Sequence, residues 1–270
     1  MTSVTLRSGE VRESGYDKHP NYRVWLEPSP KRVRVRYNGH VLVDSVHARL
    51  LYETRHVPVY YFPREDVDWA CLSPTSHSTF CPFKGEAAYW SIRVGDQNQD
   101  NVVWGYPQPL EEVQGLDAYF ALYWDKMDQW LEEDEEVFVH PRDPYVRLDA
   151  LASTREVEVR IAGETVAMSR NAVFLFETGL PVRYYLPISD VRMDFLVPSE
   201  TVTRCPYKGT ARHYNAIVSG QELKDAAWLY ESPVHEAEPI AGHICFYGER
   251  VEKITIDGET VETPRTKWST

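Results

Sequence analysis

One seven-residue segment occurs twice in this chain of 270 residues. Thr79–Gly85 (TFCPFKG) returns as Thr203–Gly209 (TRCPYKG), at an offset of 205 − 81 = 124 residues. The same offset aligns residues 33–137 with the second half of the chain without a gap. An internal copy of this length predicts two homologous domains, each of the ~100–150 residues that can bury a core of their own.

The alignment also divides the chain. Residues up to 30 show little periodicity and end in a proline-rich stretch, which is typical of an extended arm. The proline-stiffened junction at 140–145 predicts that the repeats pack closely, as in a fused dimer with a pseudo-twofold axis. We predict an N-terminal arm, a first repeat domain, a second repeat domain and a C-terminal tail, at residues 1–18, 19–139, 140–262 and 263–270.

Local patterns within each repeat predict strands and hairpins. Residues 31–37 alternate apolar and polar side chains, and Asn38-Gly39 is a strong hairpin signal before a return strand at 40–44. Aromatic and β-branched runs such as 87–94 continue the pattern, with Gly and Pro between them. The predicted fold class is therefore all-β: two tandem β-rich domains with few helices.

Residues 117–136 test this prediction. Taken alone, the segment has the periodicity of an amphipathic helix with an acidic end, and a helix stays an alternative there. Its copy at 241–260 instead contains a hairpin around Asp257-Gly258, which aligns with Glu133-Asp134. Because homologous halves share a fold, we predict strands and a hairpin in both, with the acidic run 132–136 as a solvated turn.

Charge and cysteine content limit the partners. The formal net charge of −12 opposes both a nucleic-acid-binding face and attraction to an anionic membrane. No run approaches the ~20 apolar residues of a membrane span, and the start lacks the apolar core of a signal peptide. Only two of the four cysteines, Cys81 and Cys205, are copies of one another. We expect a soluble protein of the reducing cytoplasm, with no nucleic-acid or membrane partner.

Polar and aromatic residues that both repeats retain are the candidate site residues. Glu53 and Glu177 interrupt apolar runs, so each carboxylate is expected to be partly buried and paired. Lys84 or Arg36 is available to Glu53, and Lys208 or Arg160 to Glu177. Such a group is either a salt bridge that pins two strands, or a general base or ligand anchor in a pocket.

The repeated cysteines also allow two interpretations. Cys81 and Cys205 are either buried, inert thiols or nucleophiles whose pKa is lowered by the lysine three residues on. A catalytic thiol needs a positioned base, yet no histidine occurs at the same place in both repeats, since His213 aligns with Tyr89. The candidate catalytic residues are Glu53, Cys81, Lys84, Glu177, Cys205 and Lys208.

Aromatic residues complete the candidate site. Their side chains either wall a pocket for a planar or cationic ligand or pack in a core. No metal site is predicted, because the chain lacks C-x-x-C and H-x-x-x-H spacings, and no cofactor is expected, because it lacks a Gly-rich phosphate loop. The candidate ligand-binding residues are Tyr61, Trp104, Tyr185, Trp228 and His213.

Several of these motifs resemble a known family. They are RVRYNG, LYET, YYFPREDV, TFCPFKGEAAYW and VWGYPQP, which begin at residues 34, 51, 60, 79 and 103. Together they resemble the domain-of-unknown-function family 427, which some collections file under a nucleotidyltransferase-type name. The resemblance covers both halves and implies β-tent-like domains of two facing sheets. Some β-tent relatives hold zinc through cysteine pairs, which this chain lacks, and no paired-carboxylate metal site supports the nucleotidyltransferase name.

The function expected from the sequence is binding of a small molecule in an equivalent pocket of each repeat. One alternative is an enzyme that uses Cys81 or Cys205 with the neighbouring lysine and glutamate. The other is a structural or protein-interaction module, in which the repeated polar residues pin the sheets.

Overall fold

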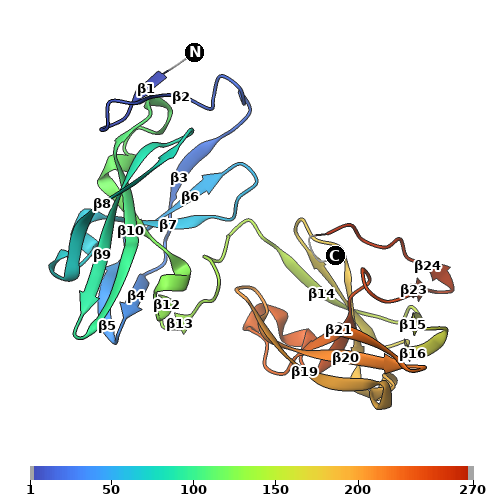
Figure 1. Cartoon of the computed structure of the whole chain (residues 1–270). Coiled ribbons are helices and arrows are strands. Elements are labelled where there is room, and N and C mark those ends of the chain that lie inside the picture. Colours follow the sequence, from blue (N-terminus) through green and yellow to red (C-terminus); the bar gives the residue numbers. More distant parts are fainter. Residues whose placement is uncertain (1–2, 267–270) are drawn as a thin grey trace. The chain divides into compact units, whose positions relative to one another are not determined.

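The computed structural model describes residues 3–266, so the ends of the predicted arm and tail, residues 1–2 and 267–270, lie outside the described residues. The chain divides into two compact units, residues 1–143 and 144–270. Each contains a seven-stranded and a four-stranded antiparallel sheet (Figure 1). All helices between residues 3 and 266 are short 3-10 turns, and none has the length and apolar character needed to cross a membrane. The all-β prediction is confirmed.

In the first unit the large sheet has the strand order β3-β6-β7-β11-β10-β9-β8, and the small sheet β13-β12-β4-β5. The large-sheet strands are β3 (Val24–Pro28), β6 (Arg49–Glu53), β7 (Val59–Pro63), β8 (Leu72–Cys81), β9 (Gly85–Val94), β10 (Gln97–Pro109) and β11 (Tyr119–Leu122). The small-sheet strands are β4 (Val33–Tyr37), β5 (His40–Ser45), β12 (Gln129–Glu132) and β13 (Glu135–Glu136). A separate hairpin pairs β1 (Ser3–Thr5) with β2 (Val11–Glu13).

The second unit repeats this arrangement with the strand orders β14-β17-β18-β22-β21-β20-β19 and β16-β15-β23-β24. The large-sheet strands are β14 (Leu148–Ser153), β17 (Ala172–Glu177), β18 (Arg183–Pro187), β19 (Leu196–Cys205), β20 (Gly209–Val218), β21 (Gln221–Tyr230) and β22 (His243–Phe246). The small-sheet strands are β15 (Val157–Ile161), β16 (Glu164–Ser169), β23 (Lys253–Ile256) and β24 (Glu259–Thr260). The matching strand orders fit a duplication.

Each large sheet buries apolar side chains on both of its faces. Side chains alternate along a strand, so Tyr60 and Phe62 of β7 enter the main core between the two sheets, whereas Tyr61 joins a second cluster on the opposite face. Tyr184 and Tyr185 divide in the same way in the second unit. We call the face that carries the second cluster the outer face of the large sheet.

The segment that tested the sequence prediction is not a helix. Residues 117–136 contain β11, β12 and β13, with a turn at Glu133-Asp134. The prediction of strands and a hairpin, taken from the copy at 241–260, is therefore confirmed. Within the turn, Glu133 takes a left-handed conformation with φ of 52°, and its copy Asp257 has the same φ. The hairpin therefore has the same geometry in both repeats, and the helical periodicity of the first copy was misleading.

Two other segments differ from the sequence prediction. The region predicted as an extended arm contains β3, which pairs with β6 as the edge strand of the large sheet. Pro74 lies inside β8, although proline is more typical of turns, and a register shift between Pro74 and Ser78 interrupts the pairing with β9. Strand β8 is the other edge of the sheet, and proline is tolerated at edges and bulges because no ladder hydrogen bond is lost there.

Candidate functional site

A row of side chains crosses the outer face of the large sheet in the first unit. The row consists of Arg49, Tyr61, Ala121, Trp104 and Tyr89, each paired in register with the next across β6, β7, β11, β10 and β9. The Trp104 Nε1–H donates a hydrogen bond to Tyr61 Oη at 3.1 Å. The fold thus brings together two residues that the sequence predicts to bind ligand.

The second unit has the equivalent row. It consists of Val173, Tyr185, Cys245, Trp228 and His213 across β17, β18, β22, β21 and β20. The Trp228 Nε1–H donates to Tyr185 Oη, again at 3.1 Å. The tyrosine–tryptophan bond is therefore a shared feature of the repeats, whereas the two ends of the row differ in chemistry.

The repeated lysine and glutamate form a buried ion pair in each unit. Lys84 Nζ donates to Glu53 Oε1, and Lys208 Nζ to Glu177 Oε2. In the first pair the lysine side chain is 9% exposed and the glutamate 16%. Four strands separate β6 from β8 in the sheet, so the pair ties the β8–β9 turn, which carries Lys84, back to the end of β6. The other carboxylate oxygen of Glu53 accepts from Tyr22 Oη at 3.0 Å.

The cysteines lie beside these ion pairs. Cys81 ends β8 and Cys205 ends β19, and both are half-buried. The lysine three residues after each thiol was expected to lower the thiol pKa. Its ammonium instead forms an ion pair with a glutamate. This geometry fits the interpretation of the glutamate and lysine as a structural pin, and the catalytic roles of Cys81 and Cys205 stay predictions.

His213 is the buried titratable group of the second row. Its side chain lies in β20, the residue is 3% exposed, and its Nε2 is 2.9 Å from Thr203 Oγ1. Burial lowers the pKa of His213, so the imidazole is neutral at neutral pH. Its Nδ1 is buried without a hydrogen-bond partner among the described residues. In the first unit the aligned Tyr89 makes the equivalent contact, with its Oη 2.8 Å from Thr79 Oγ1.

A second ion pair, absent from the sequence-based candidates, covers the row of the second unit. Arg183 donates two hydrogen bonds of 2.7 Å to Glu249, whose side chain is 0% exposed. The guanidinium carbon lies 5.7 Å from the ring centres of both Trp228 and Tyr247. Burial alone would raise the pKa of Glu249, but hydrogen bonds, chiefly from Arg183, lower it to about 2. This pair cannot be found among the residues that the repeats share, because the first repeat has Val59 at the position aligned with Arg183.

A groove of about 500 Å³ opens on the outer face of the first unit. Its lining comes from the edge strand β3 and its neighbour β6, from Tyr119 at the start of β11, and from the segment 112–116, which includes parts of two 3-10 turns. The guanidinium carbon of Arg49, the first member of the row, lies 5.2 Å from the centre of the Tyr119 ring. The lining residues are Val24, Trp25, Leu26, Arg49, Leu51, Glu112, Val113, Gln114, Gly115, Leu116 and Tyr119.

The equivalent region of the second unit has a different lining. Val173 and His243 take the places of Arg49 and Tyr119. Apolar residues from β14, β17 and the 3-10 helix η8 (His235–Ile240) pack there in one cluster. These residues include Leu148, Ala150, Val173, Ala237 and Ile240. The combination of a cation with an aromatic ring at these two positions is thus a property of the first unit.

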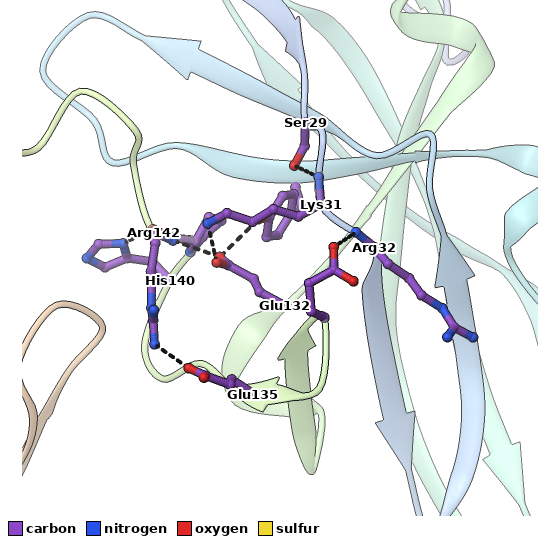
Figure 2. Close-up of polar contacts among 10 residues, drawn as sticks. Ser29, Lys31, Arg32, Glu132, Glu135, His140 and Arg142 are labelled. Carbon is purple, nitrogen blue, oxygen red and sulfur yellow. Dashed lines mark hydrogen bonds and ion pairs between the residues drawn. The ribbon is translucent and has the colours of Figure 1, made fainter. Parts of the chain in front are cut away.

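Glu132 is another buried carboxylate, and the sequence prediction of a solvated turn was wrong for it. The residue is 6% exposed, accepts from Tyr60 Oη at 2.9 Å and pairs with Lys31 Nζ. Figure 2 shows the carboxylate also holding the chain after the first repeat, through the Arg142 backbone N–H at 3.0 Å. The physical reason is strand alternation: two residues after Trp130 of the core, Glu132 points inward as well.

One family profile matches both repeats. It is described as a domain of unknown function, DUF427, with the label NTP_transf_9, and it matches residues 25–133 and 149–257. The matches cover most of the chain and confirm the resemblance that the motifs indicated. A search of curated proteins found no match.

Proposed function

We propose that this chain, which belongs to the DUF427 family through both of its repeats, binds a small organic anion in the outer-face groove of its first unit. The observation that carries the proposal is the position of Arg49. Its guanidinium lines the groove beside the Tyr119 ring. Within residues 3–266, Arg49 forms no ion pair with a carboxylate. A partly buried guanidinium beside an aromatic ring is a ready partner for a ligand carboxylate, which it can bind through two parallel hydrogen bonds.

The apolar part of the lining, which lies beside Glu112 and Gln114, supports an apolar ligand body. Leu26 and Leu51 come from the neighbouring strands β3 and β6, and Val113 and Leu116 from the segment before β11. A volume of about 500 Å³ falls within the range of small-molecule sites, which are mostly apolar with a few polar groups that fix orientation. The ligand class that fits is therefore a compact apolar or aromatic molecule with one carboxylate or a similar anionic group.

The second unit supports the proposal by contrast. Where the first unit has Arg49 beside the Tyr119 ring, the second has Val173 and His243. Its outer face also carries a cation of its own, Arg183, already paired with Glu249 and placed over Trp228. We therefore assign binding to the first unit, rather than to an equivalent pocket in each repeat, and a supporting role to the second.

Calorimetric titration of the full chain with 2-naphthoate and with uncharged 2-naphthamide tests the proposal. Both probes have the same ring body, so their difference reports the anion contact. We expect the naphthoate to bind more tightly, and Arg49→Gln to weaken it by about 10-fold to 100-fold while changing the amide little, as expected for hydrogen bonds to charged groups of ~1.5–3 kcal/mol. Arg93→Gln, at an exposed position of β9, is the matched control. Equal binding of the two probes, or naphthoate binding unchanged in Arg49→Gln, would overturn the proposal.

A further inference from the structure

We infer that the first unit also holds a divalent metal ion of the zinc class, bound by His40, Asp68 and Cys71. The candidate donor atoms of these three residues all lie within 4.8 Å of one another. Each residue is half-buried, which leaves room for a water or ligand group to complete the coordination. The site lies apart from the groove of the proposed function and does not depend on that proposal.

The fold brings the three donors together from two separate segments. His40 begins β5 directly after the Asn38-Gly39 turn. Asp68 is the N-cap of the 3-10 turn η2 (Trp69–Cys71), and Cys71 ends that turn. The backbone hydrogen bond from Asp68 N to Leu42 O, 2.8 Å, fastens η2 against β5 and sets the two segments in register.

Existing hydrogen bonds already orient the donors toward one another. His40 Nε2 lies 2.8 Å from Asp68 Oδ2, while Asp68 Oδ1 accepts from the Ala70 backbone N–H at 3.0 Å. Cys71 Sγ is 3.3 Å from the Asp68 carbonyl oxygen. A carboxylate held by a backbone amide is the kind of outer support that metal-ligating groups usually have. Binding needs only that the ion replace the histidine–aspartate contact and bind the thiolate, with the thiol proton released to solvent.

The donor set identifies the class of metal. One imidazole nitrogen, one thiolate sulfur and one carboxylate oxygen are the ligands that Zn²⁺ prefers, and three of them with an open position are typical of tetrahedral sites. At zinc–ligand distances of about 2.0–2.3 Å, tetrahedral donors lie about 3.3–3.8 Å apart, within the 4.8 Å spread observed. Mg²⁺ and Ca²⁺ prefer ligand sets made of oxygen atoms alone, so this mixed donor set does not suit them.

The second repeat provides an internal comparison. At the aligned positions it has Glu164, Arg192 and Phe195, so a cation stands where the first repeat has Asp68. Arg192 is paired with Asp194 at 2.6 Å. The proposed site therefore belongs to the first unit. The ion would link the β4–β5 hairpin of the small sheet to η2, which comes directly before β8 of the large sheet. Spacing motifs could not reveal it, because His40 is 28 residues from Asp68.

Cobalt titration of the chelator-treated full chain tests the inference. Co²⁺ bound in a tetrahedral site with a thiolate gives intense d–d bands and a sulfur-to-metal charge-transfer band, and Zn²⁺ should displace it. We expect one equivalent of Co²⁺ per chain, a charge-transfer band that disappears in Cys71→Ser, and affinity reduced at least about tenfold in that variant. Cys205→Ser, which removes the half-buried thiol of the second unit, should behave like the wild type.

His40→Gln gives a second test, since His40 is half-exposed and its loss leaves the core intact. Far-ultraviolet circular dichroism should confirm that each variant is folded. In the wild type, Zn²⁺ should raise the thermal midpoint of the first unit, and in His40→Gln the rise should vanish. Absence of a charge-transfer band in the wild type, or an unchanged band in Cys71→Ser, would overturn the inference.

Discussion

Removal of one member of the Lys84–Glu53 pair should destabilise the first unit strongly. The two side chains are only 9% and 16% exposed, so Lys84→Met leaves the Glu53 carboxylate buried with Tyr22 as its remaining donor. Breaking a buried pair by deleting one partner costs about 3–5 kcal/mol, because the other charge stays desolvated. Lys18 and Glu13, which pair at 2.7 Å but are 66% and 53% exposed, provide the contrast. Lys18→Met should change the unfolding free energy little, because solvent screens an exposed pair.

Urea denaturation followed by tryptophan fluorescence measures this difference. Six of the eight tryptophans lie in the first unit, so the signal reports mainly its unfolding. We expect Lys84→Met and Glu53→Gln each to lower the unfolding free energy by about 3–5 kcal/mol. The double variant should lose less than the sum, because it leaves no unpaired charge. A loss for Lys84→Met as small as that for Lys18→Met would refute the account of a buried ion pair that holds the fold together.

Three further predictions concern other parts of the fold. The pKa of Glu249 falls from 4.5 to about 2 on folding, chiefly through the hydrogen bonds from Arg183. The ionised carboxylate with all its hydrogen bonds therefore stabilises the second unit above about pH 5 by about 3 kcal/mol, and this contribution is lost as the pH falls toward 2. The loss of stability with falling pH, followed by circular dichroism, should be less steep in Glu249→Gln. Burial raises the pKa of Cys245 to about 12, so mass spectrometry should find it the slowest of the four cysteines to react with iodoacetamide in the native protein, and rapid labelling would contradict its buried position. Gly15→Ala would place a Cβ 2.6 Å from the Phe83 ring and should loosen the N-terminal segment by about 1–3 kcal/mol, seen as faster proteolysis there; unchanged cleavage would show that Phe83 can move aside.

The repeated part of the fold was largely predictable from the sequence. The offset of 124 residues let one copy decide the structure of the other, which is why the acidic segment after Asp117 was assigned to strands against its own helical periodicity. That Glu53 is paired followed from a charge inside an apolar run, and Lys84 was one of the two partners considered. Both are cases in which local chemistry leaves few alternatives.

Features that only one repeat has could not be predicted in this way. Arg49, Arg183 and Glu132 lack a chemical equivalent in the other half, so a comparison of shared residues passes over them. Their surroundings depend on which strands become neighbours, as when Arg49 meets Tyr61 across β6 and β7. The side chains near His40 show the same limit, because a hairpin end and a 3-10 turn meet there only after folding.

The central proposal is that an anion binds to the outer face of the first unit and not to that of the second unit. Nitrogen-edited NMR of the full chain, titrated with 2-naphthoate, tests it most directly through the Arg49 side-chain Nε–H and the backbone amides of Leu51, Leu116 and Tyr119. We predict that these signals shift together with one dissociation constant, while the amides of Val173 and His243 stay unchanged. Shifts confined to other surfaces, or equal shifts in both units, would contradict the account.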